Sequence, residues 1–540
     1  MTQSSAATPV QGLVFPNAKG TAQRRSTPTV KQVLAAALAP LDADAATQVQ
    51  GEKQWRTNYP RHFKRWVEGA LAQPDTAVAS ARAGLDAAMK ALCWSADGQD
   101  MSLRDALDQF RAGSALLSRP LQTHTLAGNR SALDTGHPLA IPYKGRLLTG
   151  TALAEQARAW AVRGIIESSA AQALIDCVDN PQWFDLSDRT LVLLGAGSEA
   201  GPLKMLSRWR ANIVAIDLPR PDVWARIASI AERGNAVIHV PVTQAEAQTP
   251  WTERAGADLL THLPDIAHWL RSFKGPLDVA AHCYADGERH LRLAAAMDAL
   301  QALACHEHPQ STLAFLATPT DVYAVPQHTA ATSMARFRDR PLLSRLLQRG
   351  LSMMTGARFF KPNVESMVSK GANAKSAVVD SLVIQQGPNY ALAKRLQQWR
   401  ALVARAAGHP VSINVAPPTE TSSVLSNRAI AAGYQAADVF GVEVFQPETT
   451  TALMAALWVH DLRRGAEQTA PETAAAPAHP LDLIAQGACH GGFWTVSYCP
   501  RTALPFVAVL GLLRASWAAI KRSIKPTRNA RQQTKLLRAE

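Results

Sequence analysis

Short apolar segments alternate with helical segments from about residue 189 onward, and this alternation limits the fold more strongly than any other feature. The apolar segments cover residues 190–194, 213–216, 236–240, 277–281, 312–317 and 411–415. Helical patterns over 289–304 and 390–407 separate the later segments. Repeated strand–helix units build a parallel sheet with helices on both faces. The sequence therefore predicts an α/β fold with a doubly wound parallel sheet.

At 540 residues the chain is longer than one ordinary domain, and an apolar content of 47% is enough for a substantial core. Composition and pattern divide it into five parts. We expect a disordered N-terminus (1–30), a mainly helical N-terminal domain (31–180), the α/β domain (181–465) with an insertion at 327–375, a Pro/Ala-rich linker (466–480), and a C-terminal apolar helix with a basic tail (481–540).

The six cysteines include no CxxC pair, and they do not cluster with histidines at metal-ligand spacing. The N-terminus lacks the pattern of a secretory signal. We therefore expect reduced thiols, no metal site and a cytoplasmic protein.

A glycine-rich turn follows the first apolar segment and reads Leu-Gly-Ala-Gly-Ser-Glu-Ala-Gly over 194–201. Glycines at such a turn let the backbone approach a pyrophosphate, which then rests on the N-terminus of the following helix, expected from Pro202 to Arg210. A carboxylate at Glu199 would repel phosphates unless it turns outward. The candidate cofactor-binding residues of the turn are Gly195, Gly197, Ser198, Glu199 and Gly201.

Asp217 ends the second apolar segment, about twenty residues after the turn begins. An acid at this place usually binds the adenosine ribose hydroxyls, which favours NAD. Arg220 follows closely and could instead receive the 2′-phosphate of NADP. We expect NAD or NADP, with NAD favoured.

Tyr390 and Lys394 lie four residues apart, which places both side chains on one face of a helix. A nearby ammonium group can lower the pKa of a phenol, so that the tyrosine donates and accepts protons. Nineteen residues later comes Ile-Asn-Val-Ala-Pro-Pro-Thr over 413–419.

The glycine turn, the Tyr390/Lys394 pair and the 413–421 segment, in this order, resemble the short-chain dehydrogenase/reductase (SDR) superfamily. The resemblance covers roughly 186–465 and implies a Rossmann-type, NAD(P)-binding sheet. It makes Tyr390 the proton donor and acceptor, and it makes Lys394 the group that binds the nicotinamide ribose. It also assigns cofactor contacts in the later segment to Asn414, Pro417, Thr419 and Thr421.

The chain departs from the SDR pattern at the serine or threonine that hydrogen-bonds the substrate carbonyl. Position after the fifth strand favours Thr318 or Thr320, whereas proximity in sequence to the tyrosine favours Ser381, and the sequence leaves the three open. The Asn-Ala-Gly motif usual after the fourth strand is replaced by Ala-His-Cys-Tyr-Ala-Asp-Gly over 281–287.

Two other functions fit part of the pattern. The glycine turn followed by Asp217 also resembles motif I of S-adenosylmethionine-dependent methyltransferases, although those enzymes have no use for the Tyr390/Lys394 pair. A nucleotide-binding scaffold with an inactive SDR fold is the other alternative. The expected reaction remains NAD(P)-dependent interconversion of a carbonyl and an alcohol.

Much of the formal net charge of +13 lies in the last thirty residues, which follow or end an apolar run at 502–513. The run is too short to span a bilayer, but with Trp517 and the basic flank it could lie at a membrane surface. It could equally pack against the sheet or form a dimer contact. We expect a small-molecule or acyl substrate, an anionic membrane surface as partner of the tail, a homo-oligomer, and no nucleic-acid partner.

Overall fold

The protein is described from a computed structural model. The structure describes residues 11–18, 21, 23–112, 119–129, 131, 138–244, 248–356, 358–365, 367–369, 375–426, 428–468 and 479–524. Most of the expected linker, at 469–478, and much of the expected tail, at 525–540, therefore lie outside the described residues.

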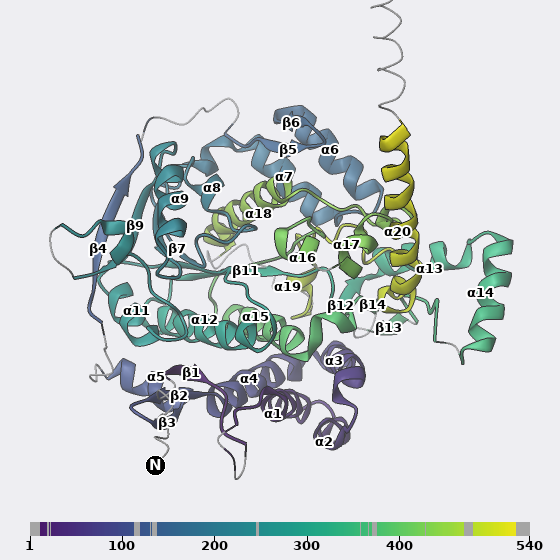
Figure 1. Ribbon diagram of the computed structural model, residues 1–540, viewed down its shortest axis with the longest axis horizontal. Helices are drawn as coiled ribbons and strands as arrows, with labels where there is room; N and C mark the ends of the chain where they lie inside the picture. Colours follow the sequence, from purple (N-terminus) through teal and green to yellow (C-terminus); the bar gives the residue numbers. More distant parts are fainter. Residues whose placement is uncertain are drawn as a thin grey trace, which may run out of the picture.

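A seven-stranded sheet forms the centre of the molecule, with strand order β15-β11-β10-β7-β8-β9-β4 (Figure 1). Its strands are β4 (Leu121–Ala127), β7 (Thr190–Leu194), β8 (Asn212–Ile216), β9 (Val237–Thr243), β10 (Asp278–Ala281), β11 (Thr312–Ala317) and β15 (Val411–Val415). Six strands run parallel, and β4 pairs antiparallel with β9. The predicted α/β class is confirmed, but the sheet is mixed because the N-terminal half of the chain contributes β4.

Alternate residues of the strands face two separate hydrophobic layers, as the pleat of a strand requires. Val192 and Leu194 face one core and Leu191 and Leu193 face the other. The first layer contains α11 (Leu263–Leu270), α12 (Gly287–Glu307) and α15 (Gly387–Ala406). The second contains α6 (Gly150–Val162), α7 (Ser168–Asp179), α9 (Pro221–Glu232) and α18 (Pro447–Gln468).

The N-terminal region adds a third, mainly helical layer outside α12 and α15 (Figure 1). It contains α1 (Ser26–Leu38), α2 (Ala43–Gly51), α3 (Trp55–Ala72), α4 (Pro74–Ala91) and α5 (Leu103–Arg111), with a small sheet of β1 (Gly12–Val14), β2 (Cys93–Ala96) and β3 (Gln99–Ser102). The sequence predicts disorder up to residue 30, but residues 12–14 form strand β1, and α1 already begins at Ser26. Residues 12–14 pair with β2, and Leu13 is buried where its N–H donates to the carbonyl of Leu260 at 2.7 Å.

The segment expected as an insertion, 327–375, is part of a larger unit that spans 322–380 and contains an antiparallel sheet and two helices. The sheet has the order β12-β14-β13, from β12 (Val322–Pro326), β13 (Met367–Ser369) and β14 (Lys375–Asp380). The helices are α13 (Gln327–Arg338) and α14 (Leu342–Met354), and α14 projects from the body (Figure 1).

The chain after β15 is helical. Its helices are α16 (Ser422–Ser426), α17 (Arg428–Tyr434), the 3₁₀ helix η3 (Ala437–Phe440), α18, α19 (Asp482–Ala485) and α20 (Pro500–Ile524). Within the described residues, no helix is both long and apolar enough to cross a bilayer.

Candidate functional site

A cavity of about 1620 Å³ lies at the carboxyl ends of the parallel strands. Residues that follow β7, β8, β10, β11 and β15 all line it, among them Gly195, Asp217, His282, Thr318 and Ala416. Its volume exceeds the roughly 300–1,000 Å³ of an ordinary small-molecule pocket. The cavity therefore has room for more than one ligand.

The glycine turn forms one wall of the cavity, and its shape depends on missing side chains. Gly195 has φ +92°, and a Cβ there would lie 2.7 Å from the Cα of Cys283. The N–H of Gly197 donates to Oδ2 of Asp217 at 2.7 Å, and Arg226 donates to the carbonyl of Gly197 at 2.9 Å. The turn, the acid after β8 and the segment after β10 are thus packed directly against one another.

The helix expected after this turn is much shorter than the sequence predicts. It is α8 (Leu203–Leu206), a single turn, followed by non-helical turns up to Arg210, which has φ +57°. Seventeen residues separate β7 from β8, and seven of them form the glycine turn. Gly201 closes the turn by donating to the carbonyl of Ser198 at 2.9 Å and does not line the cavity.

Glu199 bridges the glycine turn to the segment after β15. Its carboxylate accepts hydrogen bonds from the backbone N–H of Ser422 at 3.0 Å and from the Ser422 hydroxyl at 3.1 Å. Both residues line the cavity, as does Ser198. The Glu199 charge is therefore held by Ser422, yet it remains beside the turn that would bind phosphates.

Asp217 and Arg220, the two residues expected to read the adenosine ribose, both line the cavity. Asp217 also accepts from the backbone N–H of Leu218 at 2.8 Å, so each carboxylate oxygen has one partner and retains acceptor capacity. Arg220 pairs with Asp222 at 2.7 Å. A 2′-phosphate would have to compete with Asp222 for that guanidinium group.

Tyr390 and Lys394 lie one turn apart on α15, and both line the cavity. The Tyr390 ring stacks on His290 with 5.2 Å between ring centroids. Burial raises the pKa of Tyr390 to about 12, although its hydrogen bond with Thr318 acts in the opposite direction. Burial lowers the pKa of Lys394 to about 8.

The expectation that Lys394 lowers the pKa of Tyr390 is wrong for this arrangement. Nζ of Lys394 donates to the carbonyl of Leu316 at 3.0 Å and lies 6.0 Å from the centre of the tyrosine ring. Burial therefore dominates the tyrosine pKa, and the lysine charge is directed at the end of β11.

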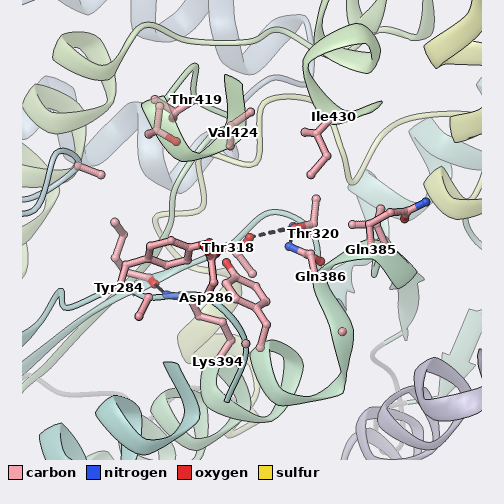
Figure 2. Close-up of a pocket in the computed structure, with 18 of the residues that line it drawn as sticks. Tyr284, Asp286, Thr318, Thr320, Gln385, Gln386, Lys394, Thr419, Val424 and Ile430 are labelled. Carbon is pink, nitrogen blue, oxygen red and sulfur yellow. Dashed lines mark hydrogen bonds between the residues drawn. The ribbon is translucent and has the colours of Figure 1, made fainter. Parts of the chain in front are cut away.

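The structure distinguishes among the three hydroxyl candidates. Thr318 hydrogen-bonds Tyr390, and its hydroxyl lies 3.0 Å from that of Thr320, to which Gln386 donates at 2.5 Å. Figure 2 shows Thr318, Thr320, Gln386 and Lys394 around the cavity. Ser381 is fully buried, its hydroxyl donates to the carbonyl of Phe493 at 3.4 Å, and it does not line the cavity. Topology, not proximity in sequence, identifies the partner of Tyr390.

Three of the four residues expected after β15 line the cavity, namely Pro417, Thr419 and Thr421. The exception is Asn414, whose amide donates to Oδ2 of Asp461 at 2.9 Å within a buried network on the far side of the strand. The structure therefore does not bring Asn414 to the cavity.

Sequence reasoning misses several residues around Tyr390. Tyr284 lies 6.2 Å from Tyr390 between ring centroids and donates to Asp286 at 2.9 Å. Tyr284 lies within the segment that replaces Asn-Ala-Gly, and His290 follows it closely. The departure of this segment from the SDR pattern could have pointed to both residues. Gln386 is the residue before α15, and no feature of the sequence pointed to it.

The cavity continues into an apolar arm lined by helices from the C-terminal part of the chain. Its lining includes Val424, Ile430, Tyr434, Phe440, Val442, Tyr498, Leu504 and Val507. Figure 2 shows Val424 and Ile430 across the cavity from Thr318 and Lys394. The apolar run at 502–513 is therefore partly a wall of the cavity.

Family models give no match to this chain, and a comparison with curated protein sequences gives no significant match. The likeness to SDR enzymes therefore depends on the residues and geometry described above.

Proposed function

We propose that the protein is an NAD(P)-dependent oxidoreductase of SDR type that interconverts a carbonyl and an alcohol. One observation carries the proposal: Tyr390, Lys394 and Thr318 line the same cavity as the glycine turn and Asp217. A dinucleotide needs backbone close to its pyrophosphate and an acceptor for its ribose, and carbonyl reduction needs a proton donor. A single cavity offers all three.

The strand order supports a Rossmann-type sheet. Numbered along the chain, the parallel strands follow the spatial order 3-2-1-4-5-6 from β9 to β15, which is the order of dinucleotide-binding folds. The order reverses between β7 and β10, and ligands of such sheets bind outside the carboxyl ends at that point. Gly195 after β7 and His282 after β10 line the cavity there.

The residues of the cavity have complementary roles in this proposal. When bound, NADH or NADPH supplies a hydride to the carbonyl carbon. The phenol of Tyr390, protonated at neutral pH, donates its proton to the carbonyl oxygen. Thr318 hydrogen-bonds that oxygen, and Lys394, cationic below its pKa of about 8, binds the nicotinamide ribose.

The ion pair between Arg220 and Asp222 favours NAD over NADP, because Asp217 retains acceptor capacity whereas the guanidinium group is already engaged. The apolar arm supports a substrate with a hydrocarbon chain, such as a fatty aldehyde or an acyl ketone, with its carbonyl at Tyr390.

Titration with NADH, NADPH and S-adenosylmethionine tests the proposal. Trp55 lines the cavity, so intrinsic tryptophan fluorescence should report binding, with calorimetry as a second measurement. We expect NADH to bind, NADPH to bind more weakly, and S-adenosylmethionine not to bind. Binding of S-adenosylmethionine alone would instead support a methyltransferase, and binding of no nucleotide would contradict all nucleotide-dependent functions.

Glu199→Gln sharpens the same experiment. It removes a negative charge beside the turn while it keeps an oxygen that accepts from Ser422. The affinity for NADH, whose pyrophosphate carries two negative charges, should rise about fivefold.

Glu155→Gln, an exposed change on α6, is the matched control and should have no effect. If Glu199→Gln leaves NADH affinity unchanged, the pyrophosphate does not bind at this turn.

A further inference from the structure

Helix α14 exposes its apolar side to solvent and turns its polar side toward the rest of the protein. Six of its seven leucine and methionine side chains are 65% to 87% exposed, namely Leu342, Leu343, Leu346, Leu347, Met353 and Met354, whereas Leu351 is half-buried. The polar residues of the opposite side, Ser344, Arg345 and Gln348, are half-buried. Gln348 accepts a hydrogen bond from Arg340 at 2.9 Å, which secures the polar side toward the body.

The exposed apolar residues of α14 form one continuous face. At about 100° per residue, the six exposed apolar residues lie within a sector of about 140°, and the half-buried Leu351 lies outside it. Arg349, which is exposed, lies at the edge of this sector, and no acidic residue occurs between 340 and 356. A helix with one apolar face and basic side chains at its border is typical of helices that lie in a membrane interface.

Helix α20 carries a second exposed apolar surface. Val509, Leu512, Leu513 and Trp517 are 54% to 65% exposed. The chain that follows, 521–540, contains seven basic residues and one acidic residue, Glu540. An aromatic residue at the end of an apolar surface, next to basic residues, again fits the boundary between acyl chains and anionic headgroups.

Helices α14 and α20 lie on the same side of the molecule (Figure 1), and an aromatic cluster connects α20 to α13, the helix that precedes α14. Phe506 of α20 packs on Phe360 at 4.6 Å between ring centroids, Phe360 packs on Tyr498 at 5.2 Å, and Tyr498 contacts Phe337 of α13 at 5.9 Å. Tyr498 also lines the apolar arm of the cavity. Helix α20 and the helix that leads into α14 therefore meet beside that arm.

We propose that α14 and α20 bind the surface of an anionic lipid bilayer, with their apolar faces at the level of the acyl chains. Charge selects this occupant over a second copy of the chain. A symmetric contact between two α14 helices would bring Arg349 residues together without an acidic partner, whereas anionic headgroups would neutralise them. The inference does not depend on nucleotide binding, so the nucleotide titration and the vesicle experiment can fail separately.

The test uses the full chain and vesicles of phosphatidylcholine with a minority of phosphatidylglycerol. We expect the protein to float with these vesicles at low salt, to be released at high salt, and to bind pure phosphatidylcholine much more weakly. Absence of flotation at low salt, or equal binding to both vesicle types, overturns the proposal.

The double variant Leu346→Ser/Leu347→Ser tests whether vesicle binding depends on the α14 face or on exposed apolar side chains in general. Both side chains are exposed, so the fold should tolerate the change, while vesicle affinity should fall about tenfold per leucine. The matched control is Leu147→Ser/Val162→Ser, whose side chains are 64% and 89% exposed and belong to neither α14 nor α20.

The proposal is overturned if both double variants bind like the parent. It is also overturned if the Leu346→Ser/Leu347→Ser change instead halves the mass measured by light scattering, because the face would then be a contact between copies.

A chain ending at Ile524 tests the charge contribution without touching the wall of the cavity. It lacks five basic residues, Lys525, Arg528, Arg531, Lys535 and Arg538. Affinity for the anionic vesicles should fall about tenfold or more, and the salt dependence should weaken. Unchanged affinity together with unchanged salt dependence would contradict binding through anionic headgroups.

Discussion

Replacing Tyr390 with phenylalanine is expected to lower the rate of carbonyl reduction by about 10²–10⁴-fold, because a general acid at the reacting oxygen typically contributes that factor. NADH affinity should change little, since the phenol hydroxyl is directed at Thr318 and not at the glycine turn. The measurement is the loss of NADH absorbance with long-chain aldehydes and ketones, together with a nucleotide titration of the variant.

Tyr434→Phe is the matched control, because Tyr434 lines the same cavity from α17 and should be dispensable for proton transfer. The pH dependence gives a second readout. Lys394 loses its charge as the pH rises through about 8, so turnover supported by Lys394 should decline there. If Tyr390→Phe turns over substrate at the parental rate, Tyr390 is not the proton donor.

Replacing Asp321 with alanine is expected to lower the free energy of unfolding by about 3–5 kcal/mol, because it leaves a buried guanidinium group without its counter-ion. Asp321 and Arg395 are 2% and 1% exposed and lie 2.9 Å apart. The same carboxylate also accepts from Gln398 at 2.9 Å and from the backbone N–H of Val322 at 2.7 Å. Urea unfolding followed by circular dichroism measures the effect.

Two further variants control for that result. Asp321→Ala/Arg395→Met removes both charges and should recover much of the lost stability, since an apolar pair can replace a buried ion pair. Asp438→Ala breaks the exposed pair with Arg514 and should cost less than about 1 kcal/mol. If Asp321→Ala costs no more than Asp438→Ala, the buried pair does not stabilise the fold.

The parallel strands could be predicted because their short sequences are rich in apolar and β-branched residues. Residues 190–194, 312–317 and 411–415 are β7, β11 and β15 with the same bounds. Strand β4 gave no such pattern, because its side chains are mostly half-buried or exposed at the edge of the sheet. Its place beside β9 depends on pairing across more than a hundred residues, which local patterns do not contain.

The site was predictable where a residue follows a strand directly. Asp217 and Thr318 reach the cavity for that reason. Asn414 lies within its strand instead and faces away from the cavity. Helix α8 is shorter than the sequence predicts, and the positive φ of Arg210, which no right-handed helix adopts, is not visible in the sequence. The apolar arm could not be predicted, since it forms where α17 and α20 pack together, and local patterns do not contain that packing.

The position of β4 also limits how this chain can be divided. It covers the outer edge of β9 along seven residue pairs, from Leu121 to Ala127. A fragment beginning at residue 181 would expose that edge, with its unpaired backbone groups and the apolar side chains of Ile238 and Val240. Such an edge is a template for pairing with other chains. The N-terminal region therefore protects the sheet against self-association, besides forming a helical layer of its own.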